Sequence, residues 1–216
     1  MLYVCSKGQY YDRILRLKRY FEEERHSHNF LITHEDTNNP KDLVFPFTDD
    51  EEFAGGIVAI LETATIENSK NTGNVIGSTN IGGIAGESKG TITQCRNDGQ
   101  VSKVAGVICK TVNLGGLVGK NGEAARLSNS KNYGNVNSET DTLVNLGGIC
   151  GILYNNSIVE LCENNGAISG SGKEIIPNED TNTNCASCTS NNGGSASTDD
   201  FGQLNIGIIY GKYQEI

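Results

Sequence analysis

Short runs of aliphatic residues recur between residues 53 and 211, and glycine or asparagine bounds each run. The runs take two alternating forms, one of which carries two adjacent glycines, as in Asn113–Gly119 (NLGGLVG). Each run is too short for a helix and is rich in the β-branched residues that favour strands. The pattern therefore predicts short strands joined by tight turns.

Near-copies of Asn113–Gly119 recur at quasi-regular distances. They are Phe53–Ala59, Asn80–Gly86, Asn145–Gly151 and the degenerate Asn205–Gly211. Gly82 and Gly115 are 33 residues apart, and Gly115 and Gly147 are 32 apart, which is typical of solenoid turns. A phosphate-binding glycine loop occurs once, before a helix. Recurring glycines instead indicate places where stacked coils approach closely, and here they are Gly82, Gly83, Gly115, Gly116, Gly147 and Gly148.

The other form of run has its copies at Ile66–Val75, Ile92–Val101, Leu127–Val136 and Val159–Ile168. Equivalent positions of stacked strands lie about 4.8 Å apart, so the copies predict columns of like side chains. Three columns are aliphatic: Ile66, Ile92, Leu127 and Val159; Val75, Val101, Val136 and Ile168; and Leu117 with Ile57, Ile84, Ile149 and Ile208. A column of small residues contains Ser69, Cys95, Ser130 and Cys162, and we expect its two cysteines to be buried structural thiols.

Asparagine occupies one position of every copy, at Asn71, Asn97, Asn132 and Asn164. Glycine follows two residues later, at Gly73, Gly99, Gly134 and Gly166. Stacked amides bond to one another and to the turn backbone, and we expect the glycines to supply positive φ. We interpret these residues as coil corners, with a second such row at Asn80, Asn113, Asn145 and Asn205.

The fold class predicted for residues 51–216 is an all-β solenoid, a right-handed parallel β-helix-like stack of about five coils. The spacing ahead of the Gly-Gly element varies from 5 residues between Val75 and Asn80 to 37 between Ile168 and Asn205. All variable length therefore falls at one corner, where function tends to cluster in solenoids. The longest such segment predicts a loop insert at about residues 169–203.

Residues 1–50 lack the repeat. Asp12 is a suitable N-cap for a helix over residues 13–24, and three apolar residues would share one face of it: Ile14, Leu17 and Phe21. End coils of a stack expose strand edges, so we expect residues 1–50 to form a small α-containing cap. The alternative is that they are the remnant of an upstream domain.

The composition and net charge of the chain limit the classes of partner that it is expected to bind. The 216 residues carry a net charge of −9, 27 glycines and no tryptophan. Nucleic acid is not expected as a partner because phosphate binding needs clustered Lys and Arg. No run is long enough to span a bilayer, and the first residues lack the design of a signal peptide. The chain is therefore expected to be cytoplasmic or a segment of a longer secreted protein, and nothing in it predicts a cofactor.

One column is basic on an otherwise acidic protein. Lys70, Arg96 and Lys131 follow the small-residue column, and Glu163 takes their place in the fourth copy. Like charges at strand spacing are unfavourable unless they splay into solvent or meet an anion. We therefore name Lys70, Arg96 and Lys131 as a candidate binding site for an anionic glycan, with solvated side chains as the alternative.

The insert contains Cys185 and Cys188 in a lone Cys-x-x-Cys. A degenerate coil or flexible loop, a disulfide or free thiols, and a metal site all remain open, although zinc needs two further ligands. The residues from Cys188 onward resemble the Asn-containing run with one residue added. Three histidines, His26, His28 and His34, are a second candidate metal cluster, with an exposed polar loop as the alternative.

The two forms of run together resemble the GLUG repeat of bacterial surface and secreted proteins. The resemblance covers residues 53–170 and 204–211 and implies a β-helix-like solenoid outside the cell, often within large adhesin-like proteins. GLUG repeats also occur beside a metallopeptidase domain in some immunoglobulin-cleaving enzymes. This chain has no His-Glu-x-x-His, so that activity does not carry over.

The sequence favours a non-enzymatic, surface-exposed binding or structural module that is adhesin-like, with a glycan or host surface protein as partner. One alternative is a β-helix carbohydrate enzyme, a polysaccharide lyase or hydrolase, which needs paired carboxylates. Candidate carboxylates lie near the corners, but no two share a position in adjacent coils: Asp98, Glu123, Glu139 and Asp141. Another alternative is a scaffold that self-associates end to end.

Overall fold

The computed structural model describes residues 31–33, 43–44, 52–105, 109–138, 143–154, 156–177, 185–192, 194–207 and 209–214. These residues form strands and turns and contain no helix. The helix predicted over residues 13–24 lies outside the described residues, so the α-containing cap is not supported.

The strands form four sheets, in which every pair of neighbours is parallel. Sheet A contains β1 (Leu31–Thr33), β5 (Thr65–Glu67), β10 (Thr91–Thr93), β15 (Arg126–Ser128), β20 (Ile158–Glu160) and β23 (Cys185–Ala186). Sheet B contains β6 (Lys70–Asn71), β11 (Arg96–Asn97), β16 (Lys131–Asn132), β21 (Glu163–Asn164) and β24 (Thr189–Ser190).

The other two sheets complete the coils. Sheet C has the order β2 (Leu43–Val44), β7 (Val75–Gly77), β12 (Val101–Lys103), β17 (Val136–Asn137), β22 (Ile168–Pro177), β25 (Gly194–Gly207), β18 (Leu143–Gly147), β13 (Val112–Gly115), β8 (Asn80–Gly82) and β3 (Phe53–Gly55). Sheet D contains β4 (Val58–Leu61), β9 (Ala85–Ser88), β14 (Val118–Asn121), β19 (Cys150–Tyr154) and β26 (Tyr210–Gln214).

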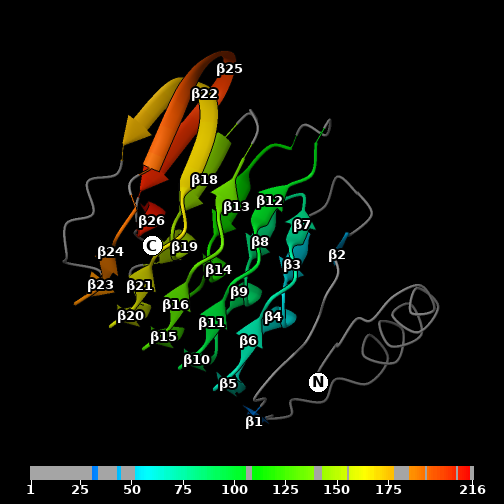
Figure 1. The fold of residues 1–216 in the computed structure, drawn as a ribbon, viewed down its shortest axis with the longest axis vertical. Coiled ribbons are helices and arrows are strands. Elements are labelled where there is room, and N and C mark those ends of the chain that lie inside the picture. Colours follow the sequence, from blue (N-terminus) through cyan, green and yellow to red (C-terminus); the bar gives the residue numbers. More distant parts are fainter. Residues whose placement is uncertain are drawn as a thin grey trace.

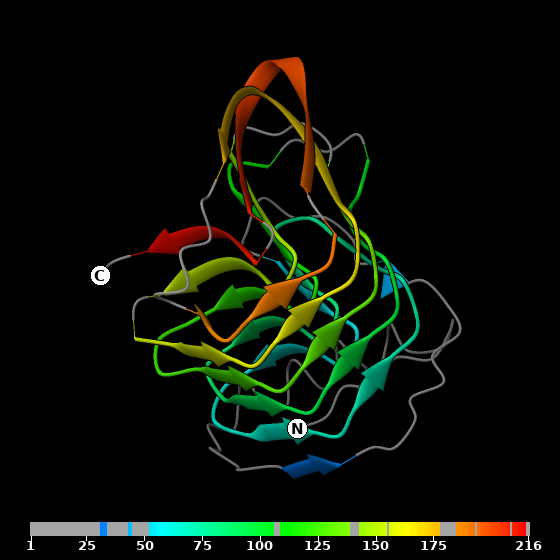
Figure 2. The same ribbon diagram turned by 60° about the vertical axis from the view of Figure 1, so that its left-hand side comes forward.

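The chain passes through sheets A, B, C and D in the same order on successive turns, so the fold is solenoid-like (Figures 1 and 2). Ile92 pairs in register with Ile66 and Leu127, and Val101 pairs with Val75 and Val136. These pairings confirm the first two predicted aliphatic columns. The third is confirmed through Ile149 but was wrong in its last member, because Ile149 donates its N–H to Ile209 and not to the predicted Ile208.

The apolar columns form two separate cores. One lies mainly between sheets A and D and includes Ile66, Ile84, Leu117 and Leu127. The other lies within sheet C and includes Val75, Ile81, Leu114 and Val136. The two cores do not merge. Buried asparagine side chains, described below, lie between them.

The N-terminal region contributes backbone strands to the stack. Leu31–Thr33 pairs with Thr65–Glu67, and Leu43–Val44 pairs with β7. Part of residues 1–50, predicted as a cap, therefore extends sheets A and C by one strand each.

The segment predicted as a loop insert is in part a further turn of the stack. β23 pairs with β20 and β24 pairs with β21, so Cys188 lies in the small-residue column beside Cys162. Ile168 pairs with Gly194, 26 residues later, as Glu163 does with Thr189. The equal spacing means that this coil contains no added residue after Cys188, contrary to the expectation. Asn192 therefore occupies the position of the turn glycine.

β25 contacts β22 along two separate segments of sheet C, and its last segment also pairs with β18. Gly194–Thr198 adds to the outer side of β22, whereas residues 203–206 lie between β18 and residues 174–177 of β22. The register shifts between Gly172 and Glu174, and Gly202 has a φ of 81°. The pair extends beyond the stack at the corner where the sequence predicted variable length (Figure 1).

Positive φ values occur at a different position from the one expected. One residue per coil, immediately before the small-residue column, has φ between 49° and 56°: Asn68, Gln94, Asn129, Leu161 and Ser187. Gly99, Gly134 and Gly166 are not in this region. They are glycines because an added Cβ would lie under 3.0 Å from the carbonyl of the glycine one coil before.

Leu161→Asn should raise the free energy of unfolding by about 1 kcal/mol, because asparagine tolerates left-handed φ better than leucine does. Leu161 is 55% exposed, so little packing is lost. Urea denaturation measures the change. Leu161→Ala is the matched control and should give no such gain, since alanine keeps the Cβ and lacks the polar side chain. Equal stabilities for the two variants would contradict the assignment of strain.

Candidate functional site

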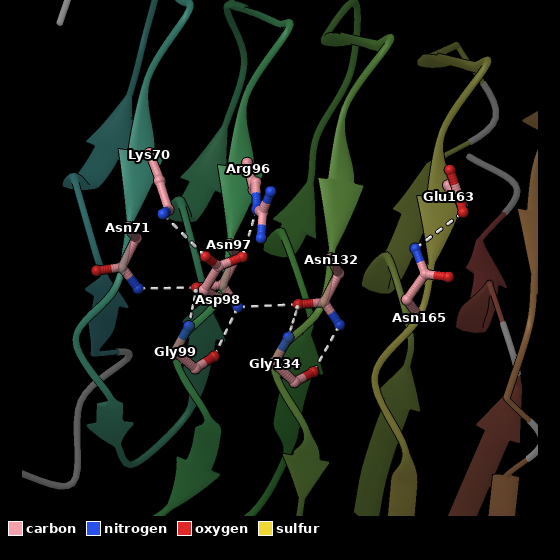
Figure 3. Close-up of polar contacts among 10 residues, drawn as sticks. All are labelled: Lys70, Asn71, Arg96, Asn97, Asp98, Gly99, Asn132, Gly134, Glu163 and Asn165. Carbon is pink, nitrogen blue, oxygen red and sulfur yellow. Dashed lines mark hydrogen bonds and ion pairs between the residues drawn. The ribbon is translucent and has the colours of Figure 1, made fainter. Parts of the chain in front are cut away.

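Buried asparagine side chains form a continuous hydrogen-bonded ladder along the stack, here called the amide ladder (Figure 3). Asn71 Nδ2 donates to Asn97 Oδ1 at 2.8 Å, and Asn97 Nδ2 donates to Asn132 Oδ1 at 2.9 Å. Asn132 Nδ2 continues to Asn164 Oδ1 at 2.8 Å. Asn164 Nδ2 in turn donates to Ser190 Oγ at 3.3 Å. The ladder therefore crosses five coils without interruption.

Each amide of the ladder also closes onto its own turn. Asn97 Nδ2 donates to the carbonyl oxygen of Gly99 at 2.8 Å, and Gly99 N–H donates to Asn97 Oδ1 at 3.2 Å. Asn71, Asn132 and Asn164 make the same pair of bonds. Asn97 thus uses both donors and accepts twice, which leaves no hydrogen-bonding capacity for a ligand.

The Gly-Gly elements face this ladder. A Cβ added at Gly83 would lie under 3.0 Å from Asn97 Cγ, and one at Gly116 would lie as close to Asn132. The first glycine of each pair faces a backbone carbonyl: a Cβ at Gly82 would clash with Ala85 O. The expectation of close approach at these glycines is therefore confirmed.

The asparagines lie at a turn, as interpreted, and the predicted bonds of their stacked amides to one another and to the turn backbone are confirmed. Asn71, Asn97, Asn132 and Asn164 are at most 1% exposed. They form a buried polar seam because the glycines opposite leave room for a full amide. The second row is also a ladder, but it donates toward the preceding coil: Asn113 to Asn80, Asn145 to Asn113 and Asn205 to Asn145, at 2.7 to 2.8 Å.

The predicted basic column lies on the surface, and its side chains pair with nearby carboxylates. We call Lys70, Arg96, Lys131 and Glu163 the charged stripe. Lys70 Nζ lies 3.0 Å from Asp98 Oδ2, and Arg96 Nε lies 2.5 Å from Asp98 Oδ1. Lys131 Nζ lies 2.7 Å from Glu163 Oε2. Lys70–Asp98 and Lys131–Glu163 therefore join neighbouring coils, whereas Arg96 and Asp98 pair within one coil.

These ion pairs set the protonation of the two carboxylates. Partial burial raises the pKa of Asp98, but hydrogen bonds from Arg96 and Lys70 outweigh it, so the net pKa is lowered. Hydrogen bonds from Lys131 and Asn165 lower the pKa of Glu163 against a smaller opposing effect of burial. Both groups are thus held ionised.

An exposed aromatic ring accompanies the stripe. Arg96 Cζ lies 4.3 Å from the centre of the Tyr133 ring, and Tyr133 is 40% exposed. Tyr133 was not singled out from the sequence. Its position two residues after Lys131, equivalent to that of Asp98 after Arg96, was the available signal.

The small-residue column has the predicted character. Cys95 and Cys162 are free and buried, and each thiol donates to the carbonyl two residues before it, at 3.3 and 3.4 Å. Ser69 and Ser130 make the same bond with their hydroxyls. Burial raises the pKa of Cys95 to about 11 and that of Cys162 to about 12.

The metal hypotheses gain no support within the described residues. No group of three or more His, Cys, Asp or Glu side chains there is arranged to hold a metal ion. Cys188 is disulfide-bonded, so it offers no thiolate, and a metal site with Cys185 applies only to the reduced protein. His26, His28 and His34 lie outside the described residues.

Comparison with known proteins found no matching family model, no matching curated protein and no matching solved structure. The resemblance to the GLUG repeat therefore rests on the two forms of run alone. In the part of the chain that the structure describes, no helix has the length and apolar character needed to cross a membrane.

Asn97→Asp should lower the free energy of unfolding by about 2–4 kcal/mol, because a carboxylate cannot donate to Asn132 Oδ1 or Gly99 O, and each buried acceptor left unpaired costs about 1–3 kcal/mol. Asn74→Asp is the control: Asn74 is exposed and its Oδ1 only accepts, from Gln100 N–H. Chemical denaturation distinguishes the two. A loss of similar size in both variants would show that the ladder is not responsible.

Acid should destabilise the protein through Asp98. Its pKa is lowered on folding from an ordinary value of 3.8, so the unfolded state binds more protons and stability falls as pH drops from about 5 through the folded pKa. The melting temperature of Asp98→Asn should change less over this range than that of the wild type. Glu123→Gln, at an exposed position, should follow the wild type. Parallel curves for Asp98→Asn and wild type would contradict the prediction.

Proposed function

We propose that the chain is a non-enzymatic repeat module that serves as a rigid structural and binding element of an adhesin-like protein at the cell surface or in the secreted state. We propose further that its stack is a right-handed parallel β-helix of the GLUG type, with about five coils. The parallel pairing of equivalent residues from coil to coil supports this architecture.

The observation that carries the proposal is the engagement of polar groups across coils. The amide ladder joins coils in the interior, and Lys70, Asp98 and the Lys131–Glu163 pair join them on the surface. Cross-coil bonds of this kind favour a stiff rod over a site that must close around a substrate.

The partner that this surface suits best is a glycan. Arg96 and Lys131 keep about half of their side-chain surface exposed, at 49% and 51%, beside the Tyr133 ring. Exposed cations and an aromatic ring on adjacent coils give hydrogen-bond donors and an apolar face in one strip. A host surface protein is the other partner to be tested.

The carbohydrate-enzyme alternative is less favoured at this surface. Glycoside hydrolysis uses a general acid whose pKa is raised. Asp98 and Glu163 have lowered pKa values. Two of the other carboxylates considered from the sequence, Glu139 and Asp141, lie outside the described residues.

A glycan array with the intact chain tests the proposal. Wild type should bind one or more glycans, and the triple variant Lys70→Gln, Arg96→Gln and Lys131→Gln should lose at least tenfold in affinity. Glutamine removes the cations without placing new acids beside Asp98 and Glu163.

The matched control removes as many cations elsewhere, with Lys89→Gln, Lys110→Gln and Lys173→Gln. It should bind as the wild type does. Circular dichroism establishes that both triple variants remain folded. Unchanged binding by the stripe variant, or absence of binding to any glycan by the wild type, would remove the glycan proposal.

A further inference from the structure

Two buried polar residues interrupt an aliphatic column in the larger core. Equivalent positions of β4, β9, β14 and β19 carry Leu61, Ser88, Asn121 and Leu153. Ser88 and Asn121 are both 0% exposed. Leu61 and Leu153 belong to the core between sheets A and D, so the two polar side chains lie in apolar surroundings.

Neither polar side chain has a hydrogen-bond partner within the protein. Ser88 Oγ and both polar atoms of Asn121 are buried and unpaired, and they are the only such side-chain atoms among the described residues. Buried amides elsewhere in the stack, such as Asn97, use their full hydrogen-bonding capacity. Because an unpaired buried polar group is costly, Ser88 and Asn121 need partners that the chain does not supply.

Ser88 is also smaller than the leucine at the equivalent position one coil before. A serine side chain is smaller than a leucine side chain by about two heavy atoms, which is enough for one water molecule. Leu61 fills the equivalent position one coil before, and Asn121 lies one coil after. The freed volume is therefore adjacent to the unpaired groups.

We infer that Ser88 and Asn121 hold an ordered internal water molecule between the coils of β9 and β14. The water accepts a hydrogen bond from Asn121 Nδ2 and donates one to Ser88 Oγ, which gives partners to two of the three unpaired atoms. Water supplies both functions, whereas a metal cation would face the Nδ2 donor of Asn121. This polar site is independent of the charged stripe and of the proposed glycan binding.

A high-resolution crystal structure of the whole chain tests the inference. It should show one solvent peak within about 3.2 Å of both Ser88 Oγ and the Asn121 side-chain amide. A direct hydrogen bond from Ser88 Oγ to Asn121, with no solvent density between them, would overturn it.

The variant Ser88→Val/Asn121→Leu, which restores an aliphatic column, is the matched control. Its crystal structure should show no solvent peak at this place, and its Tm should exceed that of Asn121→Leu alone, which leaves Ser88 unpaired. The wild-type density decides the matter even where a variant does not fold.

Discussion

The contact between each buried asparagine and the glycine opposite it is the constraint on which the rest of the structure depends. Asn97 fits only because Gly83 has no side chain, and Gly83 is tolerated only because the Asn97 amide fills the space and satisfies its neighbours. The pairing divides the interior into two apolar cores and holds successive coils in register. A shift of one residue between coils would break every bond of the ladder together.

The surface follows from this interior register. Once the asparagines are aligned, the residues before and after them are aligned as well, so Arg96 stacks between Lys70 and Lys131. Repulsion among these cations is relieved by Asp98 and Glu163. Exposed ion pairs contribute little stability individually, about 0–1 kcal/mol. In the proposed function, their importance lies in the ordered strip of charge that they form beside Tyr133.

Much of the stack could be predicted from sequence because equivalent residues recur at a nearly constant spacing. The columns headed by Ile66 and Val75 needed only the alignment of copies and the spacing of parallel strands. The burial of the asparagine side chains in a seam at these corners could not be read from the repeat, because it depends on which residues lie opposite. The prediction of positive φ at the turn glycines failed because a glycine in a sequence can reflect either positive φ or a lack of space for a side chain. Only the structure distinguishes the two.

Prediction was weakest where the repeat degenerates. The alignment placed Ile208 in the position that Ile209 occupies, because isoleucine there replaces a glycine and blurs the motif. For the segment around Cys185 and Cys188, the sequence left a degenerate coil and a flexible loop both open, because few of its side chains match the columns. The register shows a coil, in which Cys188 and Ser190 keep the small or polar character of their columns. In the stripe, Asp98 and Tyr133 share an outward position with no common chemistry, so only the register reveals that they line one surface.

A double-mutant cycle between Gly83→Ala and Asn97→Ser measures the central contact most directly. The added methyl group meets both the Asn97 amide and the Gly116 carbonyl oxygen in the wild type, and serine relieves the first of these two contacts. The account predicts that Gly83→Ala costs at least about 1 kcal/mol less in the Asn97→Ser background than in the wild type. Strictly additive effects of the two substitutions would contradict it.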